Sequence, residues 1–326
     1  MAMTWLVTGG AGYIGGHVVH SLLRDGEQVV VIDDLSTGRA GVVPDGVPLV
    51  VGSILDGAAL DEAFSHGVTG VIHIAGFKYA GVSVDEPLHT YQQNVVAMVT
   101  LLEAMERHRV ATMLFSSSAA VYGEVDVPLI TEEHPKNPAS PYGESKLIGE
   151  WIIGDQAAAR GLAHTSLRYF NVVGSGVPGI YDTSPYSLTS LVFGALAEGR
   201  APQVFGSDYP TRDGSCVRDY IHVQALADTH VVAAKKLAAG ENLLPAYNLG
   251  SGVGSSVKEV MAAAAEVTGI DFIPEFVDRR PGDPATVVAS GELAERDLGW
   301  VMSASLENML GSAWREFIAA NGVSSG

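Results

Sequence analysis

Tyr142 and Lys146 stand four residues apart, and the run Ser116-Ser117-Ser118 precedes them in the chain. On a helix, this spacing places the phenol and the ammonium group on one face. A phenolate can take the proton of an alcohol whose carbon gives up a hydride. Bringing a phenol from its ordinary pKa of about 10 to near neutrality costs about 4 kcal/mol, which nearby positive charge can supply. The spacing therefore predicts an alcohol-oxidising centre with Tyr142 as base, Lys146 as its charge partner and Ser118 as a hydrogen-bonding group.

A glycine-rich loop offers a place for the hydride acceptor. Gly9, Gly12 and Gly15 follow the apolar run Thr4–Thr8 with the spacing G-x-x-G-x-x-G, and a helix-like stretch comes next. Glycines let the backbone approach a pyrophosphate, and the start of a helix supplies N–H donors and a positive dipole. The position of the loop, between a strand and a helix, predicts dinucleotide binding rather than a plain turn.

The next predicted strand ends in two carboxylates, Asp33 and Asp34, shortly after the glycine loop. A carboxylate at this place accepts hydrogen bonds from the ribose hydroxyls of the adenosine half and repels a 2′-phosphate. No arginine follows until Arg39. These residues predict NAD as the cofactor rather than NADP.

Short runs rich in valine and isoleucine alternate with helix-like stretches through the first half of the chain. The predicted strands there are Thr4–Thr8, Gln28–Asp33, Pro48–Val51, Gly70–His73, Thr112–Ser116 and Ala163–Tyr169. The predicted helices there are Gly15–Arg24, Ala58–His66, Pro87–Arg107 and Ser145–Arg160. Continuous apolar strands are typical of a parallel sheet covered on both faces. The alternation predicts an α/β fold with a doubly wound, Rossmann-type parallel sheet.

The residue composition changes after Asn171, and residues 174–190 are rich in Gly, Pro, Ser and Thr. We expect a Rossmann domain made of residues 1–171 and about 218–249, and a smaller substrate-binding α/β lobe made of residues 172–217 and about 250–326. The second half is predicted to hold helices at Val223–Ala239, Ser256–Thr268 and Leu306–Ala320 and a strand at Ala246–Leu249.

The amino-acid composition restricts the partners and the cellular compartment to be expected. The net charge of −18 disfavours nucleic acid and anionic membranes as partners. The single cysteine, Cys216, rules out an intrachain disulfide and any cysteine cluster for a metal. His17 and His20 lie three residues apart without a third ligand nearby, so we expect no metal site. With neither a targeting segment nor an apolar run long enough for a membrane helix in view, we expect a cytoplasmic protein.

The glycine loop, the serine and the Tyr-x-x-x-Lys pair together resemble the extended short-chain dehydrogenase/reductase superfamily, and within it the UDP-glucose 4-epimerase family. The segments that carry the resemblance are VTGGAGYIGGH, VIHIAGFKYAGVSV, FSSSAAVYG, SPYGESKL, LRYFNVVG, VFGSDYPTRDGSCVRDYIHV, YNLGSGVGSSV, RRPGD and LGW. They run from Val7 to Trp300 and so span nearly the whole chain.

The resemblance implies the interconversion of UDP-galactose and UDP-glucose. Tyr142 takes the proton of the sugar O4, C4 gives hydride to NAD, the 4-keto sugar turns over, and hydride returns to the other face. Dehydratase and decarboxylase relatives carry an acid one or two residues after the serine, whereas this chain has Ala119 and Ala120. Because an apolar pair cannot do acid–base work, redox epimerisation fits better than elimination.

The resemblance also implies the residues that bind each ligand. Those expected at NAD are Gly9, Gly12, Tyr13, Ile14, Gly15, Asp33, Asp34, Leu35, Ser53, Ile54, Ile74, Ala75, Gly76, Lys78, Asn94, Ser118, Tyr142, Lys146 and Phe170. Those expected at the UDP-sugar are Lys78, Ser118, Tyr142, Asn171, Ser187, Leu188, Val204, Phe205, Arg218, Arg280, Asp283 and Val287. Guanidinium groups suit the diphosphate because they bind it through two parallel hydrogen bonds.

Several positions depart from the family pattern. Ser53 stands where relatives have Asp beside the adenine, and Ser187 stands where relatives have Asn against the substrate phosphates. The stretch 174–186 is shorter than in familiar epimerases, and Ala97-Met98 replaces a common Gly-Thr. Val287 occupies a position where some relatives have a bulky aromatic residue, which predicts room for an N-acetylated sugar.

Two helices offer more apolar surface than one face against a sheet needs. These side chains are Val95, Val99, Leu102 and Met105 on one helix and Leu147, Ile148, Trp151 and Ile152 on the other. Pairing both helices across a two-fold axis predicts a homodimer, as in relatives, while the alternative is that they all lie in the monomer core.

Two other functions stay open at this point. One is 4-epimerisation of another UDP-sugar, a UDP-N-acetylhexosamine or a UDP-uronic acid. The other is a catalytically silent sensor of NAD, against which the intact Ser118, Tyr142 and Lys146 argue.

Overall fold

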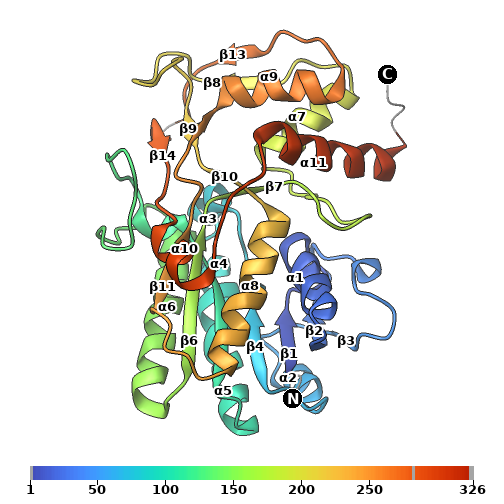
Figure 1. The fold of residues 1–326 in the computed structure, drawn as a ribbon, viewed down its shortest axis with the longest axis vertical. Coiled ribbons are helices and arrows are strands. Elements are labelled where there is room, and N and C mark those ends of the chain that lie inside the picture. The colour runs from blue at the N-terminus through green and yellow to red at the C-terminus, as the bar shows by residue number, and fades with distance from the viewer. Residues whose placement is uncertain (1–2, 281–282, 323–326) are drawn as a thin grey trace.

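A seven-stranded parallel sheet forms the centre of the computed structural model, which describes residues 3–280 and 283–322. Its strands are β1 (Thr4–Thr8), β2 (Gln28–Asp33), β3 (Leu49–Val51), β4 (Gly70–His73), β5 (Thr112–Ser118), β6 (Ala163–Tyr169) and β11 (Ala246–Leu249). They follow the order β11-β6-β5-β4-β1-β2-β3, and every neighbouring pair is parallel. The order reverses direction at β1, so the predicted doubly wound sheet is confirmed (Figure 1).

Helices cover both faces of this sheet because the strands are apolar on both sides. Helices α1 (Tyr13–Arg24) and α8 (Val223–Ala238) pack on one face, around a core that includes Trp5, Leu22 and Tyr247. Helices α2 (Gly57–Phe64), α5 (Ala97–His108) and α6 (Pro141–Arg160) belong to the other face, where Leu6, Met98 and Met113 are buried. Each helix therefore buries an apolar stripe against one side of the sheet.

The long helix predicted over Pro87–Arg107 is three helical segments in sequence. Helix α4 (Pro87–Tyr91) runs through a π-helical stretch, Gln92–Val96, into α5. Asn94 lies within the π-helical stretch with its side chain buried. A π turn shifts the register of side chains along a helix, and such turns are frequent at functional sites.

Helix α6 begins four residues earlier than the sequence predicted, at Pro141 rather than Ser145. Ser140 caps it by accepting a 3.3 Å hydrogen bond from the Gly143 N–H, and proline occupies the first helical position. Tyr142 consequently lies in the first turn of the helix. Strand β5 likewise extends two residues past its predicted end, to Ser118.

A second group of elements lies beyond the carboxyl ends of the strands (Figure 1). Its members are β7 (Asn171–Val173), α7 (Leu188–Ala197), β8 (Gln203–Phe205), β9 (Val217–Arg218), β10 (Tyr220–His222), β12 (Ser255–Ser256), α9 (Val257–Thr268), β13 (Glu275–Val277), β14 (Thr286–Val287) and α11 (Leu306–Asn321). Of these, β7, α7, β8, β10, α9 and α11 contribute to a core that contains Phe193, Val204, Met261 and Trp314.

Part of the range assigned to the smaller lobe packs against the large sheet instead. Helix α10 (Glu292–Leu298) contacts β11 and α8, and Ala294, Leu298 and Trp300 join the core of the large sheet. The division into two domains stays a prediction. Among residues 3–280 and 283–322, no helix combines the length and the hydropathy needed to cross a membrane.

Candidate active site

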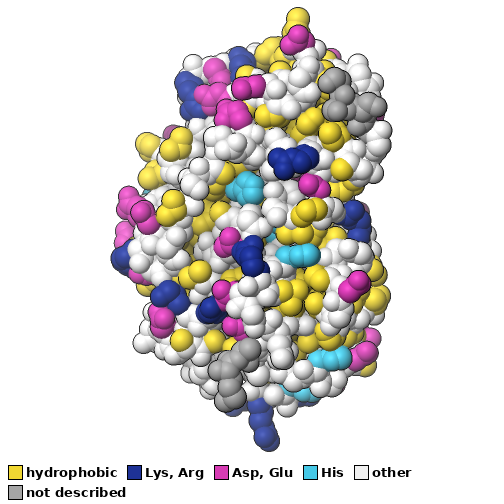
Figure 2. Space-filling model, turned by 45° about the vertical axis from the view of Figure 1, so that its right-hand side comes forward, with side chains coloured by type: hydrophobic (Ala, Val, Ile, Leu, Met, Phe, Trp, Pro, Cys, Tyr) yellow, Lys and Arg dark blue, Asp and Glu magenta, His cyan; other side chains and the backbone are white. Residues whose placement is uncertain are grey.

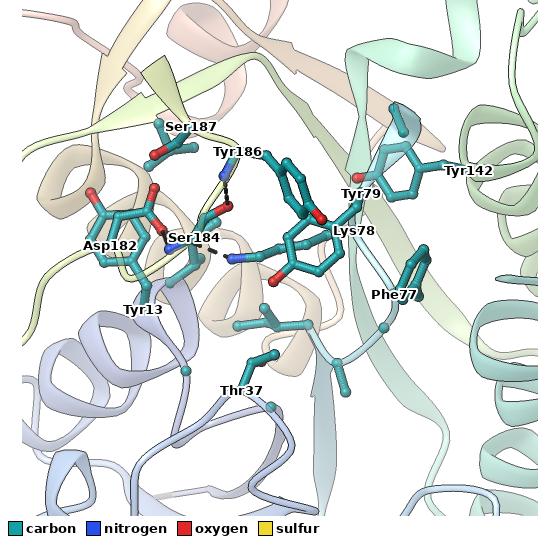
Figure 3. Close-up of a pocket in the computed structure, with 18 of the residues that line it drawn as sticks. Tyr13, Thr37, Phe77, Lys78, Tyr79, Tyr142, Asp182, Ser184, Tyr186 and Ser187 are labelled. Carbon is teal, nitrogen blue, oxygen red and sulfur yellow. Dashed lines mark hydrogen bonds and ion pairs between the residues drawn. The ribbon is translucent and has the colours of Figure 1, made fainter. Parts of the chain in front are cut away.

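One cleft of about 1070 Å³ opens at the carboxyl ends of the parallel strands, and Figure 3 shows part of its lining. It brings together most of the residues that the sequence predicted for both ligands. They are Gly9, Gly12, Tyr13, Ile14, Gly15, Asp33, Asp34, Ser53, Ile54, Ile74, Ala75, Gly76, Lys78, Tyr142, Lys146, Phe170, Asn171, Ser187, Leu188 and Arg280. Ligands of open α/β sheets bind at this edge.

The glycine loop closes tightly onto the start of α1. The backbone of Gly9 is left-handed, with φ at +71°, and the Gly12 N–H donates to its carbonyl at 3.1 Å. A side chain at Gly15 would overlap the same Gly9 carbonyl oxygen. The first turn of α1 has no side-chain cap and no acidic residue, so its N–H groups and dipole are available to an anion. This glycine-lined cradle fits a dinucleotide pyrophosphate.

Asp33 lies at the end of β2 with its carboxylate buried. It accepts 2.9 Å hydrogen bonds from the backbone N–H groups of Ala11 and Leu35, and burial raises its pKa. Asp33 thus joins the glycine loop to the turn after β2. Each carboxylate oxygen keeps further acceptor capacity, which suits a ribose hydroxyl in the cleft.

Two other residues predicted for the adenosine half have local partners. Asp34 accepts hydrogen bonds from the Ser36 N–H at 2.9 Å and the Ser36 hydroxyl at 2.6 Å. The Ser53 hydroxyl accepts from the Leu55 N–H at 3.2 Å. Leu35 has a left-handed backbone with φ at 59° and is not among the residues that line the cleft.

Tyr142, Ser118 and Lys146 meet where β5 ends and α6 begins. Burial raises the pKa of the Tyr142 phenol, and its hydrogen bond with Ser118 partly offsets this. The Ser118 hydroxyl also accepts a 3.2 Å hydrogen bond from the Ala120 N–H, which fixes its position. The Lys146 ammonium nitrogen lies 5.9 Å from the centre of the Tyr142 ring. Positive charge from Lys146 and from a bound cofactor would act on the phenol against the effect of burial.

The Lys146 ammonium is buried and donates a 2.9 Å hydrogen bond to the Ser116 carbonyl. Burial lowers its pKa to about 8, although Glu150 acts in the opposite direction. It also lies 4.9 Å from the centre of the Phe115 ring, where a cation is attracted to the ring face.

Asn94 does not line the cleft but connects two of the segments that do. Its side-chain oxygen accepts from the Phe77 N–H at 2.7 Å, and its amide donates to the Phe77 carbonyl at 2.9 Å and to the Ser145 hydroxyl at 2.8 Å. The π turn at Asn94 therefore links the segment after β4 to helix α6.

Six residues predicted for the sugar nucleotide lie outside the lining of the cleft: Ser118, Val204, Phe205, Arg218, Asp283 and Val287. Arg218 is ion-paired with Asp283, and the Arg280 guanidinium stacks 3.8 Å from the centre of the Phe205 ring. Val287 pairs with Arg218 in a small sheet and packs against the buried cluster that contains Tyr122 and Leu147. Its side chain is half-buried there.

Several residues that line the cleft were not predicted from the sequence: Tyr79, Asp182, Ser184 and Tyr186. Tyr79 directly follows the predicted Lys78, and Tyr186 directly precedes the predicted Ser187. Adjacency to a predicted ligand was the only signal, because three of the four lie in a stretch without helix or strand periodicity.

Fold and cleft together are those of a dinucleotide-binding protein built to oxidise an alcohol. The chain belongs to the NAD dependent epimerase/dehydratase family, whose model matches residues 5–250. This confirms the resemblance that the motifs indicated.

Individual relatives cover almost the whole chain. The UDP-glucose 4-epimerase of Corynebacterium glutamicum is 44% identical over 317 residues, covering 96% of this chain and 95% of the relative. That of Halalkalibacterium halodurans is 45% identical over 319 residues, with the same shares. A crystal structure of UDP-glucose-4-epimerase from Stenotrophomonas maltophila, with bound NAD and formylated UDP-arabinopyranose, superposes with a TM-score of 0.93 at 36% identity, covering 99% of this chain and 100% of that one.

We predict that Gly15→Ala weakens NAD binding by about tenfold or more, which corresponds to about 1.4 kcal/mol. The added methyl group must displace the Gly9 carbonyl and so distort the pyrophosphate cradle. Titration calorimetry with NAD measures the change. Gly154→Ala is the matched control, because a side chain there meets no atom within 4 Å. Equal affinities in both variants would contradict the cradle.

We predict that the free energy of unfolding of cofactor-free protein rises with pH more steeply than that of Lys146→Met. Because burial lowers the folded-state pKa of Lys146 from 10.5 to about 8, the unfolded chain holds the extra proton between these values. Stability conferred by deprotonation therefore grows across this window, by up to about 3 kcal/mol. Urea unfolding at pH 7.5 and at about pH 10 checks it, and parallel pH profiles for the two proteins would contradict it.

Proposed function

We propose that this chain interconverts UDP-galactose and UDP-glucose by transient oxidation at C4 of the sugar. The observation that carries the proposal is that Tyr142 and Lys146 line the same cleft as the glycine cradle, with Ser118 beside Tyr142. The names of relatives that match this chain along its length support the same reaction.

NAD is the cofactor that the cleft fits. Gly9, Gly12 and Gly15 would hold its pyrophosphate, Asp33 its adenosine ribose, and Lys146 its nicotinamide ribose. When bound, NAD supplies reversible hydride acceptance, so that each cycle ends with the cofactor in its starting state.

The protein's own residues move the proton and place the sugar. Tyr142 takes the proton of the sugar O4 and later returns it, while the Ser118 hydroxyl holds the same oxygen in line. Lys146 stabilises the phenolate by its charge, and its bond to Ser116 keeps it in place. The neighbouring Ala119 and Ala120 carry no acid, so elimination is not assisted.

The UDP half occupies the side of the cleft toward the smaller group of elements. Asn171, Ser187 and Arg280 line that side and offer an amide, a hydroxyl and a guanidinium to the diphosphate. Arg218, paired with Asp283, and Phe205, stacked under Arg280, would contact the uridine. The expectation that Val287 leaves room for N-acetylated sugars is tested by assaying UDP-N-acetylglucosamine beside UDP-galactose.

Proton NMR of purified protein with UDP-galactose and no added cofactor tests the reaction. We predict that wild type forms UDP-glucose and that Tyr142→Phe lowers turnover about 10²- to 10⁴-fold, because the base is lost. UDP-sugar binding should be largely kept, since only a hydroxyl is removed. Turnover of the variant within threefold of wild type would mean that another group is the base.

We also propose that the protein is a cytoplasmic homodimer, paired through α5 and α6. Leu102, Met105 and Leu147 are buried within the monomer, but Trp151 is 60% exposed and Val99 is 41% exposed on these neighbouring helices. Covering such side chains by a second copy removes apolar area from water.

We predict that Trp151→Asp halves the molar mass measured by light scattering at micromolar concentration, because a charge cannot be buried unpaired at the interface. Ile273→Asp is the matched control, since Ile273 is 86% exposed and lies between α9 and β13, far from α5 and α6 (Figure 1). A wild-type protein that is already a monomer would reject the dimer.

A further inference from the structure

Two tyrosine rings meet at the edge of the cleft. Tyr79 follows β4 and directly precedes α3 (Ala80–Asp85), and Tyr186 precedes α7. Their ring centres lie 4.9 Å apart at an interplanar angle of 66°. Both line the cleft, and Figure 3 shows their rings side by side between Ser187 and Tyr142. An edge-on arrangement at this distance is a favourable aromatic contact. It joins walls that are more than a hundred residues apart in sequence.

A polar contact joins the same two walls. The Lys78 ammonium lies 4.0 Å from a carboxylate oxygen of Asp182. Lys78 directly precedes Tyr79, and Asp182 stands four residues before Tyr186. The Asp182 side chain is 14% exposed and that of Lys78 is 47% exposed, so solvent reaches this pair from one side only. The two contacts together define a latch formed by Lys78, Tyr79, Asp182 and Tyr186.

The wall that carries Tyr186 is held by its own hydrogen bonds. The Ser184 N–H donates to the Asp182 carboxylate at 3.0 Å, and the Tyr186 N–H donates to the Ser184 hydroxyl at 3.3 Å. The Ser190 hydroxyl donates to the Asp182 carbonyl at 3.0 Å, which fastens the stretch to α7. These bonds set the backbone of 182–186 in place, so the ring contact requires little further ordering.

The wall that carries Tyr79 is also held by contacts of its own. The Phe77 ring packs edge-on against Tyr79 at 5.3 Å, and both backbone groups of Phe77 are bonded to the Asn94 side chain. Tyr186, by contrast, is 58% exposed. The latch therefore joins a firmly held wall at Tyr79 to a more exposed wall at Tyr186, which the contact helps to order, and it can open without disturbing the core.

We propose that the Tyr79–Tyr186 contact retains the 4-keto sugar nucleotide in the cleft between the two halves of the reaction. The inference rests on the proposed function, in which this intermediate has no covalent bond to the protein. Each sugar that escapes takes the carbonyl with it and leaves the hydride on the cofactor and the proton on Tyr142. Every escape thus yields one free UDP-4-ketohexose and one reduced cofactor, which cannot complete its cycle.

The test replaces each ring in turn, with Tyr79→Phe and Tyr186→Phe as controls that keep the rings and remove only the hydroxyls. During turnover of UDP-galactose, reduced cofactor is followed at 340 nm, and free keto sugar is trapped with borodeuteride and counted by mass spectrometry. We expect Tyr79→Ala and Tyr186→Ala to release keto sugar about 2- to 10-fold more often per turnover, the factor that one aromatic pair supplies. Both Phe variants should match wild type.

Hydrogen exchange of the amides in 182–187 reports on the latch without any reaction. The Ala variants should exchange faster there and the Phe variants should not. The latch is overturned if the Ala variants epimerise UDP-galactose normally and either their amide exchange or their keto-sugar release equals that of wild type. Release that rises equally in the Phe variants overturns the role of the rings. A wild type that does not convert UDP-galactose, yet shows faster exchange in the Ala variants, overturns the proposed function and leaves the contact itself established.

Discussion

The ammonium group of Lys146 is buried at the carboxyl edge of the sheet, where its hydrogen-bond partner is the Ser116 carbonyl. A charge removed from water costs several kcal/mol unless a partner compensates it. Helix α6 must therefore lie across the end of β5, because a shift of either element would leave the ammonium unpaired. This requirement places Tyr142, one turn earlier on α6, beside Ser118 at the end of β5.

The same helix face carries a second polar anchor one turn further on. Glu150 receives two hydrogen bonds from the Arg168 guanidinium, at 2.8 and 2.5 Å, and one from the Ser117 hydroxyl at 2.5 Å. Tyr142, Lys146 and Glu150 thus form a stripe with a spacing of four residues. The stripe faces β5 and β6, so the contacts of Lys146 and Glu150 also fix the position of Tyr142. A bidentate buried pair is geometrically specific, and breaking one side of it is strongly destabilising.

Local pattern was enough to predict the sheet and the glycine cradle. The strands β1, β2, β4, β6 and β11 have the bounds that the runs of apolar residues predicted. The start of α6 was wrong because the Ser140 cap and the following proline outweigh the weak helix propensity of Tyr142 and Gly143. The π turn at Asn94 and the Tyr79–Tyr186 contact depend on pairings between distant segments, which no local periodicity encodes. The domain boundaries and individual ligand contacts remain predictions.

The negative charge of the protein makes the glycine cradle important for binding an anionic ligand. The net charge of −18 opposes a dinucleotide and a diphosphate, and basic side chains on the face in Figure 2 lie scattered among acidic ones. Near the cleft, Lys78 faces Asp182 and Arg218 is paired with Asp283, so part of the local positive charge is already neutralised. The N–H groups and dipole at the start of α1 carry no such partner carboxylate. Fixed backbone dipoles do not change with the protein's titration. A pyrophosphate bound in the proposed cradle would therefore depend on how closely the backbone at Gly9 and Gly15 can approach it, and less on side-chain charge.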